Sequence, residues 1–148
     1  MTTWTRHAPR WVVALVCAYA AGLLCVGSVA HLSDLLRHGL HPYGWAPDWL
    51  NLYWSSLALF DTLAALLLLR GRRTGIDLAA LIMATDLAAN WYAAYGIQHS
   101  TFLDQPGLQR LTAFAALVLG TAPFARRHLR PAVATPPAGT PPPPTRSM

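Results

Sequence analysis

Two aspartates, Asp61 and Asp86, stand in the middle of long apolar stretches of the sequence. A carboxylate near the centre of a bilayer costs several kcal/mol unless it is protonated, paired or facing water. If the two carboxyl groups lie close together, one of them should hold a proton at neutral pH, because two like charges cannot both ionise cheaply in a low dielectric. Such a pair suits a proton-coupled carrier, a cation site, or acid–base catalysis on a lipid-soluble substrate.

Polar residues at helical spacing accompany both aspartates. Asn90 lies one helical turn from Asp86, and Ser55 and Thr62 share a face with Asp61. We expect these five residues to line a cavity that binds a proton or a ligand. The alternative is that they only form hydrogen bonds between helices and so fix the packing, because such contacts are common in membrane bundles.

A second group of polar residues, His31, Asp34 and His38, follows the first apolar stretch. These residues share one face if the first helix continues past Ala30, and imidazole and carboxylate groups are competent ligands for zinc, copper or iron. Histidines also occur readily at membrane interfaces, and Gly39 is expected to end the helix, so a metal site is the weaker prediction. The sequence contains no GxSxG motif and no glycine-rich phosphate loop, so it assigns no catalytic residue, and no cofactor is expected.

The elements that must position these groups follow from composition. The 148 residues are 54% hydrophobic and 11% charged, whereas ordinary soluble domains have about 25% charged residues. A span needs about 20 apolar residues, and the apolar stretches predict four spans within a transmembrane domain of residues 11–127. Short connections make neighbouring helices antiparallel. We therefore predict an all-α, four-helix up-down bundle in the membrane, with spans at about residues 11–30, 49–69, 76–96 and 108–125.

The basic residues predict the orientation. The chain has no lysine and no glutamate, and most of its eleven arginines flank the first span, the turn at residues 70–75, or the end of the fourth span. The positive-inside rule then places residues 1–10, that turn and the C-terminus in the cytoplasm, as in a multi-pass plasma-membrane protein. The net charge of +5 does not indicate nucleic-acid binding, because the arginines form no stripe with interleaved aromatics. The use of arginine and aspartate without lysine or glutamate indicates a high-GC bacterial genome.

Two charged residues near span ends are expected to interact only at the membrane interface, without a functional role. Asp77 should be an interfacial partner of Arg72 or Arg73. Arg110 lies inside the outer end of the fourth span, and its long side chain should snorkel out to the interface.

Small residues suggest which faces turn inward. Because small side chains let helices approach closely in lipid, we expect two such faces to pack against protein. The face on the first span comprises Ala14, Cys17, Ala18, Ala21, Cys25 and Ser28, and the face on the fourth comprises Thr112, Ala116 and Gly120.

The two ends of the chain carry separate predictions. The first span also resembles a cleavable signal peptide with its cleavage site after Ala30, which would leave three spans. Residues 131–148 hold seven of the twelve prolines, so this tail should be extended and disordered in the cytoplasm.

The layout of four short spans with inward acids, Asp61 and Asp86, resembles two groups of small membrane proteins, the DoxX-like group and the sterol-isomerase and sigma-2-receptor-like group. Members of the second group use acidic residues in a bundle cavity to handle cationic or sterol-like ligands. The leading hypothesis is a small carrier or binding protein for a small molecule or cation, with a protonatable cavity around the two acids. The alternatives are a non-catalytic accessory subunit, with a membrane-protein partner or a second copy, and an intramembrane enzyme acting on a lipid-like substrate. A cavity of roughly 300 Å³ or more beside the acids would favour a ligand.

Overall fold

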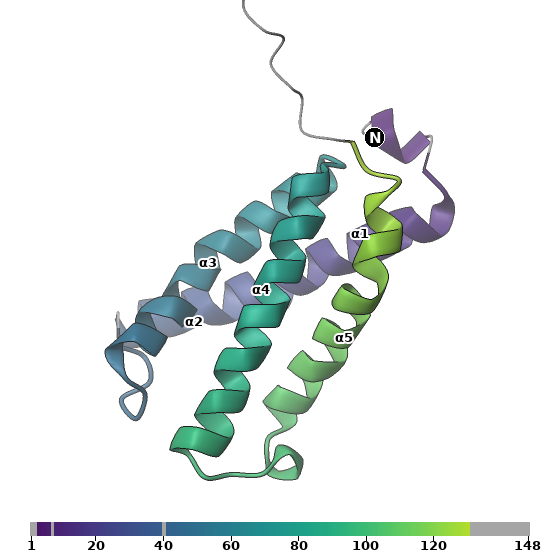
Figure 1. Cartoon of the computed structure of the whole chain (residues 1–148). Coiled ribbons are helices and arrows are strands. Elements are labelled where there is room, and N and C mark those ends of the chain that lie inside the picture. Colours follow the sequence, from purple (N-terminus) through teal and green to yellow (C-terminus); the bar gives the residue numbers. More distant parts are fainter. Residues whose placement is uncertain (1–2, 7, 40, 131–148) are drawn as a thin grey trace, which may run out of the picture.

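The structure is a computed structural model that describes residues 3–6, 8–39 and 41–130, and over these residues the chain is helical, with no β-strand (Figure 1). The prediction of an all-α fold is therefore confirmed. The proline-rich tail lies outside the described residues, so its extended conformation stays a prediction. The main helices are α1 (Arg10–Ala21), α2 (Val29–His38), α3 (Asp48–Leu69), α4 (Arg73–Trp91) and α5 (Pro106–Arg126).

The first helix continues past the expected span. A π-helical segment, Gly22–Ser28, joins α1 to α2, so that one continuous helix runs over Arg10–His38. It ends at Gly39, whose φ of 72° lies in the left-handed region that glycine adopts without strain. The end at Gly39 agrees with the sequence prediction, and the span at about residues 11–30 stays a prediction, because the amphipathic α2 can extend beyond the apolar part of the helix.

Three helices are long and apolar enough to cross a membrane: Arg10–His38, Asp48–Leu69 and Pro106–Arg126. Their length and composition indicate a membrane protein. Within the described residues α4 is not among them, and this helix carries the polar residues Asp77, Asp86 and Asn90. The third of the four expected spans is thus present as a helix, while the four-span up-down arrangement stays a prediction.

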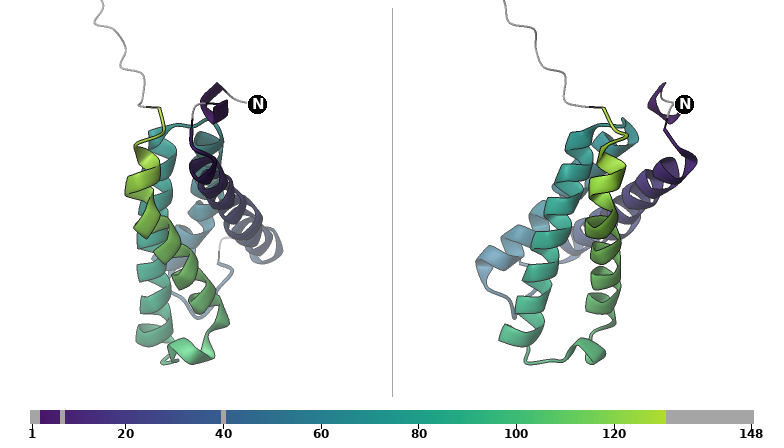
Figure 2. Two further views of the ribbon diagram at one scale, coloured as in Figure 1. Left: turned by 90° about the vertical axis from the view of Figure 1, so that its right-hand side faces the viewer. Right: turned by 45° about the vertical axis from the view of Figure 1, so that its right-hand side comes forward.

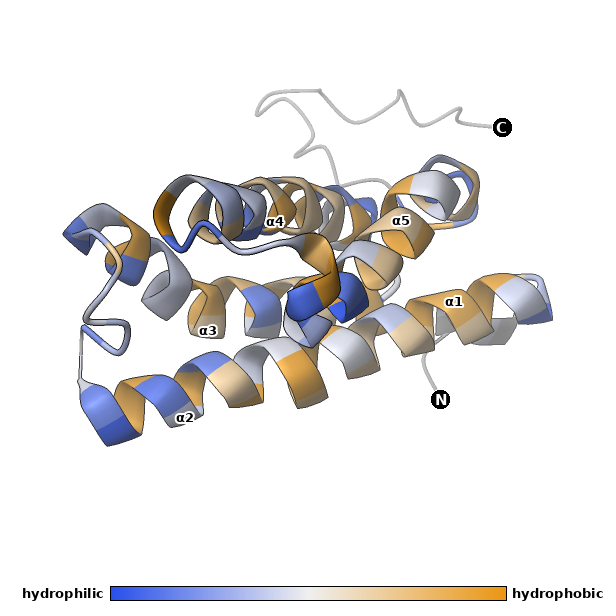
Figure 3. Ribbon diagram, turned by 90° about the horizontal axis from the view of Figure 1, so that it is seen from below, coloured by the Kyte–Doolittle hydropathy of each residue, from blue (hydrophilic) through white to orange (hydrophobic). Residues whose placement is uncertain are grey.

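Helices α3, α4 and α5 run side by side in alternating directions, with α4 in contact with both of the others (Figure 1). The long α1–α2 helix crosses them obliquely, as Figure 2 shows from two further sides. Seen from below, this helix is apolar in its middle and hydrophilic at its two ends (Figure 3). The oblique crossing matters for function, because a helix that diverges from its neighbours cannot fill all the space beside them.

One end of the molecule, which we call the closed end, is tightly held. Trp4 packs on Gly71, whose φ is 69°, and donates its indole N–H to the Leu69 carbonyl over 3.1 Å. Arg73 donates its Nε–H to the Leu129 carbonyl over 2.9 Å. Gly75 lets α3 and α4 meet, since a Cβ at this position would approach the Leu68 backbone nitrogen to 2.5 Å.

The predicted inward faces are correct for α3 and α4 and wrong for most of α1 and α5. On α3 and α4 the predicted inward acids Asp61 and Asp86 are buried, and so are the residues that share their faces at helical spacing, Asn51, Trp54, Ala65, Ala79 and Met83. On α1 the small residues are exposed except for Ser28, and on α5 Ala116 and Gly120 are exposed as well. The physical reason is that the oblique crossing turns other faces of these two helices toward their neighbours. The residues that α1, the π-helical segment and α5 bury instead are Val12, Val16, Tyr19, Ala20, Leu23, Leu108, Ala115, Val118, Ala122 and Ala125.

Asp77 forms an ion pair, but not with the predicted arginines. Its carboxylate accepts hydrogen bonds from Arg126, at 2.6 Å from Nε and 3.1 Å from Nη2. The partner comes from α5 because α4 and α5 lie alongside each other at this end, a proximity that sequence separation conceals.

Candidate functional site

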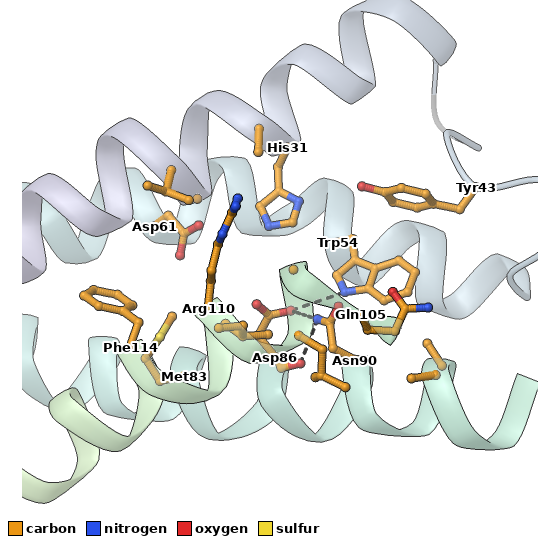
Figure 4. Close-up of a pocket in the computed structure, with 18 of the residues that line it drawn as sticks. His31, Tyr43, Trp54, Asp61, Met83, Asp86, Asn90, Gln105, Arg110 and Phe114 are labelled. Carbon is orange, nitrogen blue, oxygen red and sulfur yellow. Dashed lines mark hydrogen bonds between the residues drawn. The ribbon is translucent and has the colours of Figure 1, made fainter. Parts of the chain in front are cut away.

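A cavity of about 650 Å³ opens between the π-helical segment, α2, α3, α4 and α5 (Figure 4). It exceeds the roughly 300 Å³ that a small-molecule site requires. Three of the five predicted residues, Asp61, Asp86 and Asn90, line it. The cavity exists because the first helix crosses the others obliquely and leaves space that their side chains do not fill.

Asp86 is held by two neutral donors. The Trp54 indole N–H and the Asn90 side-chain amide both donate to Asp86 Oδ1, over 3.2 and 2.8 Å. The same amide also donates to the Asp86 main-chain carbonyl over 2.9 Å, which confirms that the two residues interact one helical turn apart. These contacts fix the carboxyl group at the edge of the cavity, where the residue is 7% exposed.

Asp61 is the opposite case. It is 2% exposed, and its Oδ1 is buried without a hydrogen-bond partner among the described residues. A buried polar atom left unpaired costs about 1–3 kcal/mol, so it calls for an explanation such as a ligand that supplies the missing donor. Within the described part of the chain no hydrogen bond joins Asp61 to Asp86, so the two acids share a cavity without forming the directly paired site that the sequence suggested.

Two basic residues face the same space. His31 and Arg110 both line the cavity, and Figure 4 shows the Arg110 side chain extending into it between Asp61 and His31. Arg110 is an exposed residue that borders the cavity, and the expectation that its side chain snorkels to the interface stays a prediction.

Aromatic rings form one wall of the cavity. Tyr43 and Trp45, from the loop before α3, pack with Trp54, with ring centroids 4.9–6.0 Å apart. Asn51 fixes the loop, since it accepts a hydrogen bond from the Tyr43 backbone N–H over 2.9 Å and donates to the Ala46 carbonyl over 2.9 Å. The sequence signal for this wall was an aromatic pair set among proline and glycine directly before α3, and sequence reasoning missed it.

The Tyr43 hydroxyl donates a hydrogen bond to the Asp34 carboxylate. Burial, together with the Asp34 carboxylate, raises the pKa of Tyr43. This contact separates the predicted metal ligands, because Asp34 is engaged by Tyr43, His31 turns to the cavity and His38 is exposed. Among the residues that the structure describes, no group of three or more potential ligands could hold a metal ion.

The π-helical segment brings the backbone close to two cavity side chains. A Cβ on Gly27 would collide with Asp61 Oδ2, and a Cβ on Gly22 would collide with the Phe114 ring. Single π-helical turns inside α-helices are frequent at functional sites. The two glycines are thus what allows α3 and α5 to present Asp61 and Phe114 to the cavity.

Ser55 and Thr62 are not among the residues that line the cavity. The Thr62 hydroxyl lies 3.1 Å from Ser28 Oγ and 2.7 Å from the Ala58 carbonyl, so it links α3 to the π-helical segment. Ser55 Oγ is buried without a hydrogen-bond partner in the described part of the chain. Helical phase placed both residues on the same face of α3 as Asp61. It could not predict which part of that face the first helix would cover and which part would border the cavity.

The cavity brings together two acids, Asp61 and Asp86, two bases, His31 and Arg110, and a wall of aromatic rings. Such a mixture can bind a polar or charged group while the rings contact an apolar part. Comparison of the chain with protein-family models, with curated proteins and with solved structures finds no match.

Proposed function

We propose that this chain is a small multi-pass protein of the plasma membrane that binds and carries a small-molecule ligand in the cavity around Asp61 and Asp86. The observation that supports this proposal best is the cavity itself, about 650 Å³ in volume, with the unpartnered Asp61 carboxyl oxygen on its wall. A bundle whose polar residues serve only to fix packing needs no such space.

The two acids have different roles in this proposal. Asp86, held by Trp54 and Asn90, is a fixed acceptor that orients the ligand. Asp61, with one free oxygen, takes up a proton or a donor group of the ligand. The proton and the donor group of the ligand exchange at Asp61, because a carboxylate buried inside the membrane is costly unless one of them neutralises its charge.

The proposed topology places both termini and the turn at Gly71 in the cytoplasm, with α4 as a fourth span. Support comes from the exposed arginines Arg70, Arg72, Arg126 and Arg127, which lie near this turn or after α5, whereas Arg37 lies at the far end of α2. A membrane-impermeant thiol reagent applied to intact cells should label Thr101→Cys and spare Thr74→Cys. The reverse labelling would contradict this orientation.

Cysteine accessibility also tests the cavity. In a chain carrying Cys17→Ser and Cys25→Ser, we expect Ala93→Cys to react with a small hydrophilic methanethiosulfonate at least about 10-fold faster than Ala79→Cys, because only the first position borders open space. The control is matched, since both alanines are buried, at 4% and 0% exposure, but Ala79 does not line the cavity. Equally slow reaction at both positions would refute a water-accessible cavity.

An accessory-subunit role is the second candidate, and one observation favours it. The small residues Ala14, Cys17, Ala18 and Ala21 of α1 are exposed, and small residues on a membrane helix suit close packing against another helix. Oxidative cross-linking at Cys17 in native membranes tests this candidate. A cross-linked species that disappears when Ala18→Leu is introduced would favour it, whereas a wholly monomeric chain would oppose it.

A further inference from the structure

The cavity holds opposite charges that do not neutralise one another by contact. Asp61 Oδ1 has no hydrogen-bond partner in the part of the chain that the structure describes. Arg110 forms no hydrogen bond and no ion pair within 4.0 Å among the described residues, although its side chain extends between Asp61 and His31 (Figure 4). Opposite charges attract strongly where the dielectric is low, so a buried carboxyl oxygen and an exposed guanidinium that border one cavity indicate a ligand that binds both.

The charge balance of the cavity points to a ligand without net charge. Its titratable lining groups are Asp61 on α3, Asp86 on α4, His31 on α2, Arg110 on α5 and Tyr43 in the loop before α3. With one proton on His31, or on either acid when His31 is neutral, these groups sum to zero. A set that is already balanced accepts a neutral or zwitterionic guest without leaving an uncompensated buried charge.

We propose that the ligand is a zwitterion whose ammonium group binds Asp61 and whose phosphate or carboxylate group binds Arg110. This inference rests on the proposed function and specifies the ligand class for the same cavity. An ammonium N–H supplies the donor that Asp61 Oδ1 lacks. The planar guanidinium of arginine is suited to bidentate recognition of phosphate and carboxylate.

The rest of the cavity fits such a molecule. Asp86 already accepts hydrogen bonds from Trp54 and Asn90, so the groups left for a ligand are the buried Asp61 Oδ1 and the exposed Arg110. The rings of Tyr43 and Trp45 border the same space and provide a surface for the methylene groups or an attached acyl chain. The zwitterion can be a free small molecule or the headgroup of a lipid, since both present the same two charges.

Binding of matched amphiphiles tests the proposal on the purified full-length chain in non-ionic detergent. The probes share one acyl or alkyl chain length and differ in the head: a lysophosphatidylethanolamine (zwitterion), a lysophosphatidic acid (anion) and an alkylamine (cation). We expect the zwitterion to bind at least about 10-fold more tightly than either singly charged probe, a ratio that calorimetric titration resolves readily. Phosphoethanolamine and β-alanine, without any chain, separate a free ligand from a lipid headgroup and a phosphate from a carboxylate.

Two variants should change the preference in opposite directions. Asp61→Asn should weaken zwitterion binding about 10-fold and reduce the preference over the anion, while Arg110→Gln should weaken it similarly and reduce the preference over the cation. Asp77→Asn and Arg126→Gln are matched controls, because they change the same two residue types in an ion pair outside the cavity, and they should leave every affinity unchanged.

The outcomes separate this inference from the proposed function. If the alkylamine binds most tightly and Arg110→Gln strengthens its binding further, the proposal of a zwitterionic ligand is wrong, whereas the proposal of a ligand-binding cavity is retained. Failure of every probe to bind, with a reactive Ala93→Cys, would likewise overturn only the zwitterion. Failure of every probe together with an unreactive Ala93→Cys would overturn both.

Discussion

The closed end of this bundle and the opposite end, which holds the cavity, differ in how tightly the helices pack. At the closed end, Trp4, Gly71 and Gly75 are packed without spare space, and Arg73 ties α4 to the Leu129 carbonyl. At the cavity end, α1–α2 diverges from α5, and the space between them is lined by charged and aromatic side chains. The difference indicates that tight packing is concentrated where the helices close, and it leaves space beside the charged groups at the other end, as the proposed binding function requires.

The largest expected effect is at the closed end. Gly75→Ala should destabilise the fold by about 2 kcal/mol, because the added Cβ meets the Leu68 backbone and the Leu67 side chain, neither of which can easily move. Gly120→Ala is the matched control, since this helical glycine faces open space and should lose no stability. Denaturant unfolding in micelles measures both. Equal losses would mean that the closed end is not specially packed.

The two acids should respond in opposite directions when each is replaced by leucine of similar shape. Asp86→Leu should cost about 1–3 kcal/mol, because it leaves the Trp54 and Asn90 donors unpaired, whereas Asp61→Leu should raise stability by about 1 kcal/mol, because it removes an unpaired buried oxygen. The same unfolding assay applies. A loss of equal size in both variants would contradict the difference between the two sites.

A smaller effect is expected at Gly27. Gly27→Ala should cost about 1 kcal/mol, since the atom it meets is the end of the Asp61 side chain, which can move aside. In a double-mutant cycle with Asp61→Ala, the cost should disappear, because the colliding carboxyl group is gone. Strict additivity of the two single changes would show that Asp61 does not pack against the π-helical segment as described.

The smallest effect is expected at the surface. Asp77→Asn removes the ion pair with Arg126. The Asp77 side chain is 47% exposed and the Arg126 side chain is 50% exposed. Exposed ion pairs contribute little because water and salt screen them, so the unfolding midpoint should not change measurably. A clear loss would show that the ion pair, and not packing alone, holds α4 to α5.

The candidate site was predictable in part. Helical phase turned Asp61, Asp86 and Asn90 inward, and these are the predicted residues that line the cavity. It could not exclude Ser55 and Thr62, because residues on one face of a helix meet different neighbours at different depths. Arg110 and the aromatic wall were missed because each reaches the cavity from an element whose direction only the packed structure fixes.

The sequence by itself determined the apolar helices, the placement of acids inside them and the inward faces of α3 and α4, since these follow from local hydropathy and the 3.6-residue period. Only the tertiary structure decided that the first helix continues to His38, crosses its neighbours obliquely and so opens a cavity. Crossing angle depends on how side chains of two helices interlock, which is a property of pairs of elements. The same cause explains why Asp61 and Asp86, alike in the sequence, differ in the fold: Asp86 accepts hydrogen bonds from two neighbouring side chains, whereas Asp61 has a buried oxygen without a partner among the described residues.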